Sequence, residues 1–131
     1  MNGTKGIIST IQKKVLLHTL EVDVNQVKLH VFTLQLNDGF SIGAEVEIIF
    51  KETAPLLVKG DDKVKVSAAN RLTVAVEDIT YGEVFAEVDL VSGIGPFTVL
   101  LTMDVIKSFD LKIGDNLLAF IKASDISIGK E

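Results

Sequence analysis

The sequence predicts a mainly all-β protein that consists of two similar halves. Apolar and polar residues alternate in several segments, most clearly over residues 84–90, and this period of two is typical of half-buried strands. The chain also repeats itself, because residues 2–11 align with residues 70–79 at an offset of 68. Each repeated unit has about sixty residues, which is close to the lower limit for an independent core. We therefore expect the two units to pack against each other or against further copies.

The strands of the second half can be placed in order. A short amphipathic helix is predicted over residues 104–109, because Met103, Ile106 and Phe109 fall on one helical face. Turn-forming residues separate the predicted strands, and a further short strand is expected at the end of the chain. The order strand, strand, strand, helix, strand, strand is that of a five-stranded OB-like barrel. The main predicted strands are 72–79, 84–90, 97–102 and 116–123.

The first half repeats this plan in weaker form. A strand is predicted at 16–22, and Ile42-Gly43 aligns with Ile113-Gly114 at an offset of 71. The stretch between Thr33 and Ile42 is shorter than its counterpart and contains Asn37-Asp38-Gly39, so its helix should be reduced to a turn. The prediction is thus two tandem five-stranded OB-like barrels, each with at most one short helix.

A charged turn marks the division between the halves. Residues 60–63 read Gly-Asp-Asp-Lys, which is typical of a connecting segment. We therefore expect a first copy over 1–59, a linker over 60–66 and a second copy over 67–131.

Composition narrows the possible functions. The chain has no cysteine and only two histidines, so disulfides, thiolate metal sites and cysteine nucleophiles are excluded and no metal-cation site is predicted. A net charge of −5 argues against a broad nucleic-acid-binding face. No Ser/His/Asp arrangement is discernible, so we do not expect an enzyme. The sequence contains no leader pattern and no long apolar run, which predicts a cytoplasmic protein without membrane insertion.

Four segments of the second half resemble a known family. Residues 67–72, 79–88, 111–115 and 121–124 are similar to the molbindin domain, also called Mop or TOBE. The opening of the first copy, its Ile42-Gly43 turn and its Phe-Lys-Glu-Thr at the end resemble the same domain, so the whole chain resembles a tandem, or di-Mop, molbindin. The resemblance implies that molybdate or tungstate is the bound ligand, held as an intact tetrahedral oxyanion without direct cation ligation.

The resemblance also implies site residues. In the second copy, the family's arginine position is Ala69 and a family serine is Val105, although Arg71 lies two residues on and would share the face of Ala69 on a strand. The first copy offers weaker candidates, which are Asn2, Thr33, Lys51 and Thr53. The second-copy candidates are Ser67, Asn70, Arg71, Thr102, Lys122, Ala123 and Ser124.

Several of these residues have a structural alternative. Lys51 and Lys122 can be solvated ends of strands, and Ser124, like Ser67, can be a turn residue. Thr102 can cap the predicted helix, since threonine is a favoured residue at a helix N-terminus.

Three classes of function remain open. The first is intracellular storage, buffering or homeostasis of the oxyanion by a homo-oligomer with sites at subunit or domain interfaces; resemblance to stand-alone tandem molbindins favours a trimer over a dimer. The second is a ligand-free or regulatory TOBE module that accompanies an oxyanion transporter, which Ala69 and Val105 would favour. The third is an OB protein that binds single-stranded nucleic acid, which the scattered aromatics and acidic charge disfavour.

Overall fold

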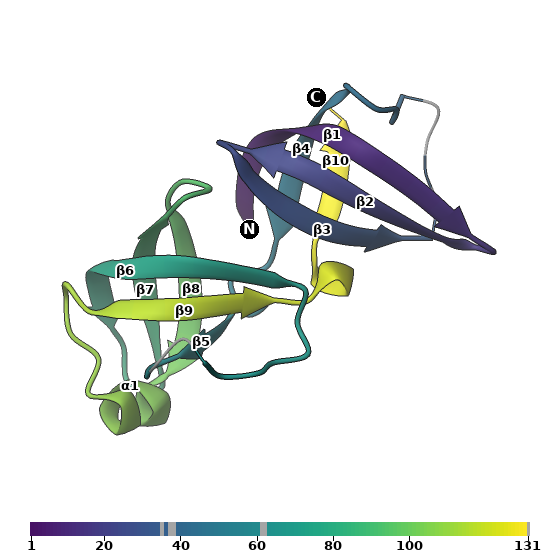
Figure 1. Ribbon diagram of the computed structural model, residues 1–131. Coiled ribbons are helices and arrows are strands. Elements are labelled where there is room, and N and C mark those ends of the chain that lie inside the picture. Colours follow the sequence, from purple (N-terminus) through teal and green to yellow (C-terminus); the bar gives the residue numbers. More distant parts are fainter. Residues whose placement is uncertain (35, 37–38, 61–62, 131) are drawn as a thin grey trace.

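Two curled antiparallel sheets of five strands each form the protein (Figure 1). The computed structural model describes residues 1–34, 36, 39–60 and 63–130. A short helix, α1 (Met103–Phe109), and a single 3₁₀ turn, η1 (Ala123–Asp125), complete the second half. The strands of the first half are β1 (Asn2–Lys14), β2 (Leu17–Val24), β3 (Val27–Thr33), β4 (Glu45–Phe50) and β5 (Leu56–Val58). Those of the second half are β6 (Asn70–Tyr81), β7 (Phe85–Ser92), β8 (Phe97–Thr102), β9 (Asn116–Ile121) and β10 (Ser127–Lys130).

The predicted fold class is confirmed: the protein is mainly β and consists of two OB-like barrels in tandem. The predicted helix corresponds to α1, and the strand predicted at 97–102 is β8. The strand predicted at 116–123 ends earlier, at Ile121, because Lys122 begins a turn. Part of the turn predicted in the first half, residues 35 and 37–38, lies outside the described residues.

Each sheet takes one edge strand from the other half of the chain. The strand orders are β10-β4-β1-β2-β3 and β5-β9-β6-β7-β8. Ile128 of β10 pairs with Ile48 of β4, and Leu57 of β5 pairs with Ala119 of β9. Figure 1 shows the yellow β10 beside β4, at the edge of the sheet that is otherwise formed by the purple and blue strands of the first half. Neither half therefore completes its sheet from its own residues.

The boundaries predicted for the two copies stay a prediction about the sequence repeat. They are 1–59, 60–66 and 67–131, and residues 61–62 of the predicted linker lie outside the described residues.

The duplication is visible in the backbone hydrogen bonds. The N–H of Gly43 donates to the carbonyl of Ile8 at 2.7 Å, and the N–H of Gly114 donates to the carbonyl of Val76 at 2.8 Å. Both glycines have a positive φ, 90° and 94°, a conformation that glycine adopts without steric cost. A bulge follows Ile8 in β1 and Val76 in β6. The aligned Ile-Gly pairs thus mark the same turn in both barrels.

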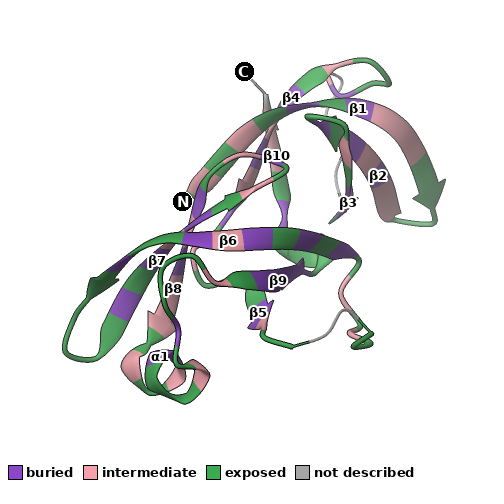
Figure 2. Ribbon diagram, turned by 60° about the vertical axis from the view of Figure 1, so that its left-hand side comes forward, coloured by how far each residue is buried: buried purple, intermediate pink, exposed green. Residues whose placement is uncertain are grey.

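The core runs without interruption from one barrel to the other. Buried residues alternate with intermediate or exposed ones over much of β2 and β7, and Figure 2 shows the same alternation along β6. The rings of Phe50 and Phe97 make an edge-to-face contact across the halves, with centroids 5.3 Å apart and planes at 75°. Because the buried residues form one cluster, the orientation of the two barrels is fixed by packing. None of the helices in the described ranges has the length and apolar character needed to cross a membrane.

Candidate functional site

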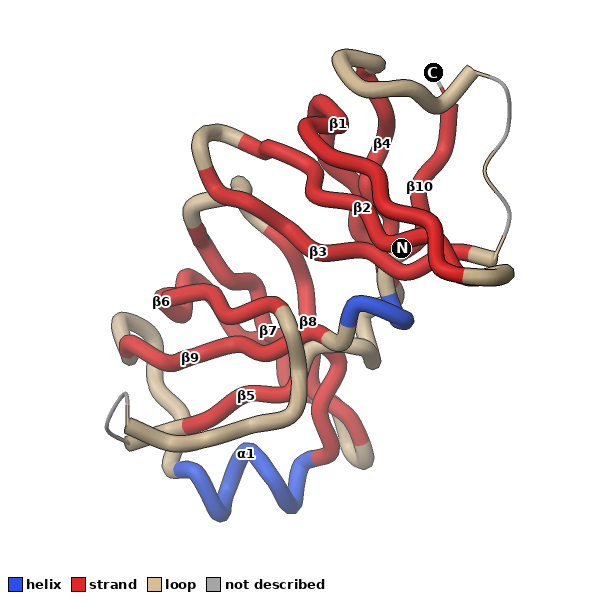
Figure 3. Tube along the Cα trace, turned by 45° about the vertical axis from the view of Figure 1, so that its right-hand side comes forward, coloured by secondary structure: helices blue, strands red, loops and turns tan. Residues whose placement is uncertain are grey.

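A lysine begins a tight turn at the end of the fourth strand of each copy. Lys51 follows β4, and its carbonyl accepts a hydrogen bond from the N–H of Ala54 at 3.0 Å. Lys122 follows β9, and its carbonyl accepts one from the N–H of Asp125 at 2.9 Å. We call these segments, 51–54 and 122–125, the closing turns. Figure 3 shows η1, which belongs to the second closing turn, between the two sheets, whereas α1 lies at the far end of the second barrel.

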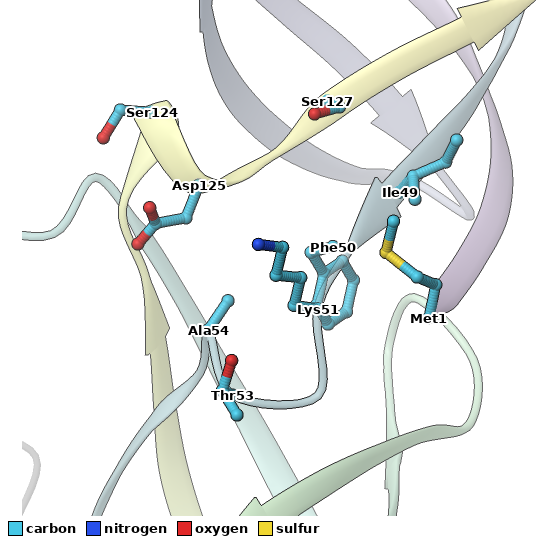
Figure 4. A pocket seen from close by; sticks show the side chains of 9 residues that line it. All are labelled: Met1, Ile49, Phe50, Lys51, Thr53, Ala54, Ser124, Asp125 and Ser127. Carbon is cyan, nitrogen blue, oxygen red and sulfur yellow. The ribbon is translucent and has the colours of Figure 1, made fainter.

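The two closing turns line a first cavity of about 470 Å³ (Figure 4). Lys51 and Thr53 come from the first turn, and Ser124 and Asp125 come from the second. Figure 4 shows the ammonium group of Lys51 extending into the space between Asp125 and the strand that carries Ser127. The structure thus brings first-copy and second-copy candidates into one cavity.

A second cavity, of about 280 Å³, is related to the first by the repeat. Lys122 and Phe120 line it at the positions that Lys51 and Ile49 occupy in the first cavity, and Ser67 adds a hydroxyl. Ala54 and Asp125 line both cavities. We call the two spaces the Lys51 cavity and the Lys122 cavity.

The polar groups of these cavities are available to a ligand. The side chains of Lys51, Thr53, Ser67, Lys122 and Ser124 make no hydrogen bond or ion pair with any other described residue. Ammonium and hydroxyl donors suit a tetrahedral oxyanion, whose oxygens accept hydrogen bonds at about 2.7–3.2 Å, and charge-assisted bonds are the stronger ones.

Asp125 is a charged lining residue that sequence reasoning missed, and Ser127 of the Lys51 cavity is a further hydroxyl residue outside the predicted set. The carboxylate of Asp125 faces both cavities and has no partner among the described residues, so it opposes the binding of an anion. Two signals were present in the sequence, since Asp125 follows Ser124 directly and aligns with the uncharged Ala54.

The two candidate asparagines link the two halves of the protein through hydrogen bonds to the backbone. The side-chain amide of Asn70 donates to the carbonyl of His30 at 2.8 Å, and the N–H of His30 donates to Asn70 Oδ1 at 2.7 Å. Asn2 makes the equivalent pair with the backbone of Thr98, at 2.8 and 2.9 Å. Asn70 is 2% exposed and lines neither lysine cavity, so its polar atoms serve the contact between barrels.

Three further candidates lie outside both lysine cavities. Thr102 caps α1, because its Oγ1 accepts a hydrogen bond from the N–H of Val105 at 3.3 Å. The guanidinium of Arg71 lies 5.8 Å from the ring centre of Phe120. Thr33 lines a neighbouring cavity of about 530 Å³, which Ser124 also borders.

Ala123 is buried within η1. Because alanine has no polar side chain, it can offer only backbone groups to a ligand.

Glu52 of the first closing turn does not line the Lys51 cavity, although its partner Met1 does. Its carboxylate forms an ion pair of 2.5 Å with the N-terminal ammonium of Met1, and this hydrogen bond lowers the pKa of Glu52.

The described residues contain no group of three or more histidine, aspartate or glutamate side chains placed to hold a metal ion.

Comparison with solved structures gives a match that covers both barrels. The structure of ModG, a cytoplasmic molybdate-binding protein crystallised with molybdate bound, matches 99% of this chain and 96% of its own, with a TM-score of 0.85 and 29% identity. A molybdate-binding protein from Sporomusa ovata matches 46% of this chain and 90% of its own, with 30% identity and a TM-score of 0.43. MopII from Clostridium pasteurianum matches 45% and 90%, with 32% identity and a TM-score of 0.42. The sequence matches no protein-family model and no curated protein.

Proposed function

Since this chain belongs to the molbindin family, we propose that it binds molybdate or tungstate as an intact tetrahedral oxyanion. The observation that carries the proposal is the match of the whole chain to ModG with molybdate bound. The two lysine cavities support it, because they gather unpaired donors at the junction of the barrels. The role that we propose is storage or buffering of the oxyanion in the cytoplasm.

Each lysine cavity supplies a different set of donors. In the Lys51 cavity, the ammonium of Lys51 and the hydroxyls of Thr53 and Ser124 hold the ligand's oxygens. In the Lys122 cavity, the ammonium of Lys122 acts with the hydroxyl of Ser67. The oxyanion brings its own oxygen ligands to the metal, so the protein needs only hydrogen-bond donors and positive charge. The ligand is bound and released unchanged, and no covalent step is involved.

The charge balance supports an oligomer. One lysine and one aspartate line each cavity, so a single chain offers less positive charge than a dianion carries. We propose a homo-oligomer, with a trimer favoured over a dimer, in which a second chain supplies further donors to each site. Native mass measurement tests this part of the proposal, and a stable monomer that binds oxyanion at full affinity would contradict it.

Calorimetric titration of the purified protein with molybdate, tungstate and sulfate tests the ligand. We expect heat with molybdate and tungstate and little with sulfate, whose smaller radius leaves donors out of reach. Lys51→Ala and Lys122→Ala should each remove one class of site, because each removes the cavity's own ammonium. Lys13→Ala is the matched control, since this exposed lysine lines neither cavity.

If no heat appears with either oxyanion at tens of micromolar, the ligand-free regulatory module becomes the better explanation.

A further inference from the structure

We infer that the carboxylate of Asp125 sets how tightly both lysine cavities hold a divalent oxyanion, and that it makes the protein discriminate between ligands by charge. The inference deepens the proposed function and rests on it. Its basis is the position of one unpaired carboxylate where the two cavities meet.

Asp125 is placed to act on both sites at once. It ends η1, its side chain is exposed, and it lines the Lys51 cavity and the Lys122 cavity. Figure 4 shows its carboxylate on the side of the first cavity toward which the ammonium of Lys51 extends. The carboxylate forms no ion pair with either lysine, so its charge is not neutralised by a close contact.

The repeat shows that this carboxylate is not required by the turn. Ala54 occupies the equivalent position of the first closing turn, and both turns form the same backbone hydrogen bond. Among the described residues that line the two cavities, Asp125 is the single acidic side chain. Because Ala54 is uncharged and Asp125 is not, the Lys51 cavity and the Lys122 cavity share one negative charge, that of Asp125.

Coulomb's law turns this placement into a rule about ligand charge. The repulsion between Asp125 and a bound anion is proportional to the anion's charge, so a dianion is opposed twice as strongly as a monoanion of the same size. At an assumed separation of about 8 Å and an effective dielectric constant of about 60, removing the carboxylate tightens the binding of a dianion about tenfold and that of a monoanion about threefold. A carboxylate that weakens binding in this way raises the Kd for molybdate and so favours release of the ligand.

The test uses the full-length Asp125→Asn variant and two tetrahedral anions. Molybdate carries two negative charges, and perrhenate carries one at nearly the same size. Titration at low ionic strength should show Kd lowered about tenfold for molybdate and about threefold for perrhenate, and both gains should shrink in about 0.5 M salt. Glu87→Gln is the matched control, because it removes the same charge from an exposed position of β7 that lines neither cavity.

Each other outcome has a definite meaning. Unchanged or weaker molybdate binding by Asp125→Asn, with normal thermal unfolding, overturns the inference and leaves the proposed function standing. Equal gains for the two anions also overturn it, because they indicate a change of shape and not of charge. If neither the wild-type protein nor the variant binds molybdate, the proposed function fails and the inference fails with it.

Discussion

The hydrogen bonds of Asn70 between the barrels give a quantitative prediction for Asn70→Ala. Asn70 is 2% exposed, and its amide makes two hydrogen bonds with the backbone of His30, at 2.7 and 2.8 Å. The alanine variant leaves the N–H and the carbonyl of His30 without these partners, and an unpaired buried group costs about 1–3 kcal/mol. Two such groups would together cost about 2–6 kcal/mol. Because His30 is only half-buried and water can reach part of the gap, we expect the free energy of unfolding to fall by about 2–4 kcal/mol.

Urea unfolding followed by circular dichroism measures this loss, and Asn2→Ala is the matched variant. Asn2 makes the same pair of bonds with Thr98 but is less buried, so its replacement should cost less. The resemblance to the molbindin family implied that Asn70 contacts the oxyanion. A stability change below about 0.5 kcal/mol, together with a large loss of molybdate affinity, would contradict the structural role of Asn70 and favour its contact with the oxyanion.

Three further predictions concern local features. Gly114→Ala should lower stability by about 1 kcal/mol in thermal unfolding; nothing lies within 4 Å of the added methyl, so the cost is backbone strain at φ 94°. Thr102→Ala should cost about 0.5–1 kcal/mol by loss of the bond from Val105 and leave Kd for molybdate unchanged; a large change in Kd would show that Thr102 contacts the ligand. The pKa of Glu52 is lower in the folded state, so its pairing with Met1 stabilises the protein above the ordinary carboxyl pKa of about 4.3 and is lost as pH falls through the folded value. Glu52→Gln should therefore unfold with a weaker dependence on pH in acid, and an unchanged acid transition would contradict this.

Local patterns were sufficient to predict the main strands of the second half, its helix and one strand of the first half. Alternation marked β7 and, more weakly, β2, and the aligned Ile-Gly pairs marked equivalent turns, because period and positive φ are properties of short segments. The same reasoning found Lys51 and Lys122 at equivalent strand ends. These features depend on residues that are near one another in the sequence.

The partners of those elements were not predictable in the same way. Leu57 carries the same apolar signal whichever sheet it joins, so its pairing with Ala119 leaves no mark on the local pattern. The bonds of Asn70 and the position of Asp125 between two cavities depend on the packing of one barrel against the other. The family pattern placed Asn70 among ligand contacts, whereas burial gives it a role between barrels.

The exchange of β5 and β10 also has a consequence for the order of events during synthesis. Ile128 pairs with Ile48 from 80 positions away, so the first barrel has only four of its strands until the second copy has been made. During that time β4 presents an unpaired edge with Val46, Ile48 and Phe50 on its apolar face, which is a surface prone to wrong pairing. Pairings so distant in sequence also slow folding, because the loop must close before the contact is gained. The nascent first half is thus the stage at which this protein most needs protection from aggregation.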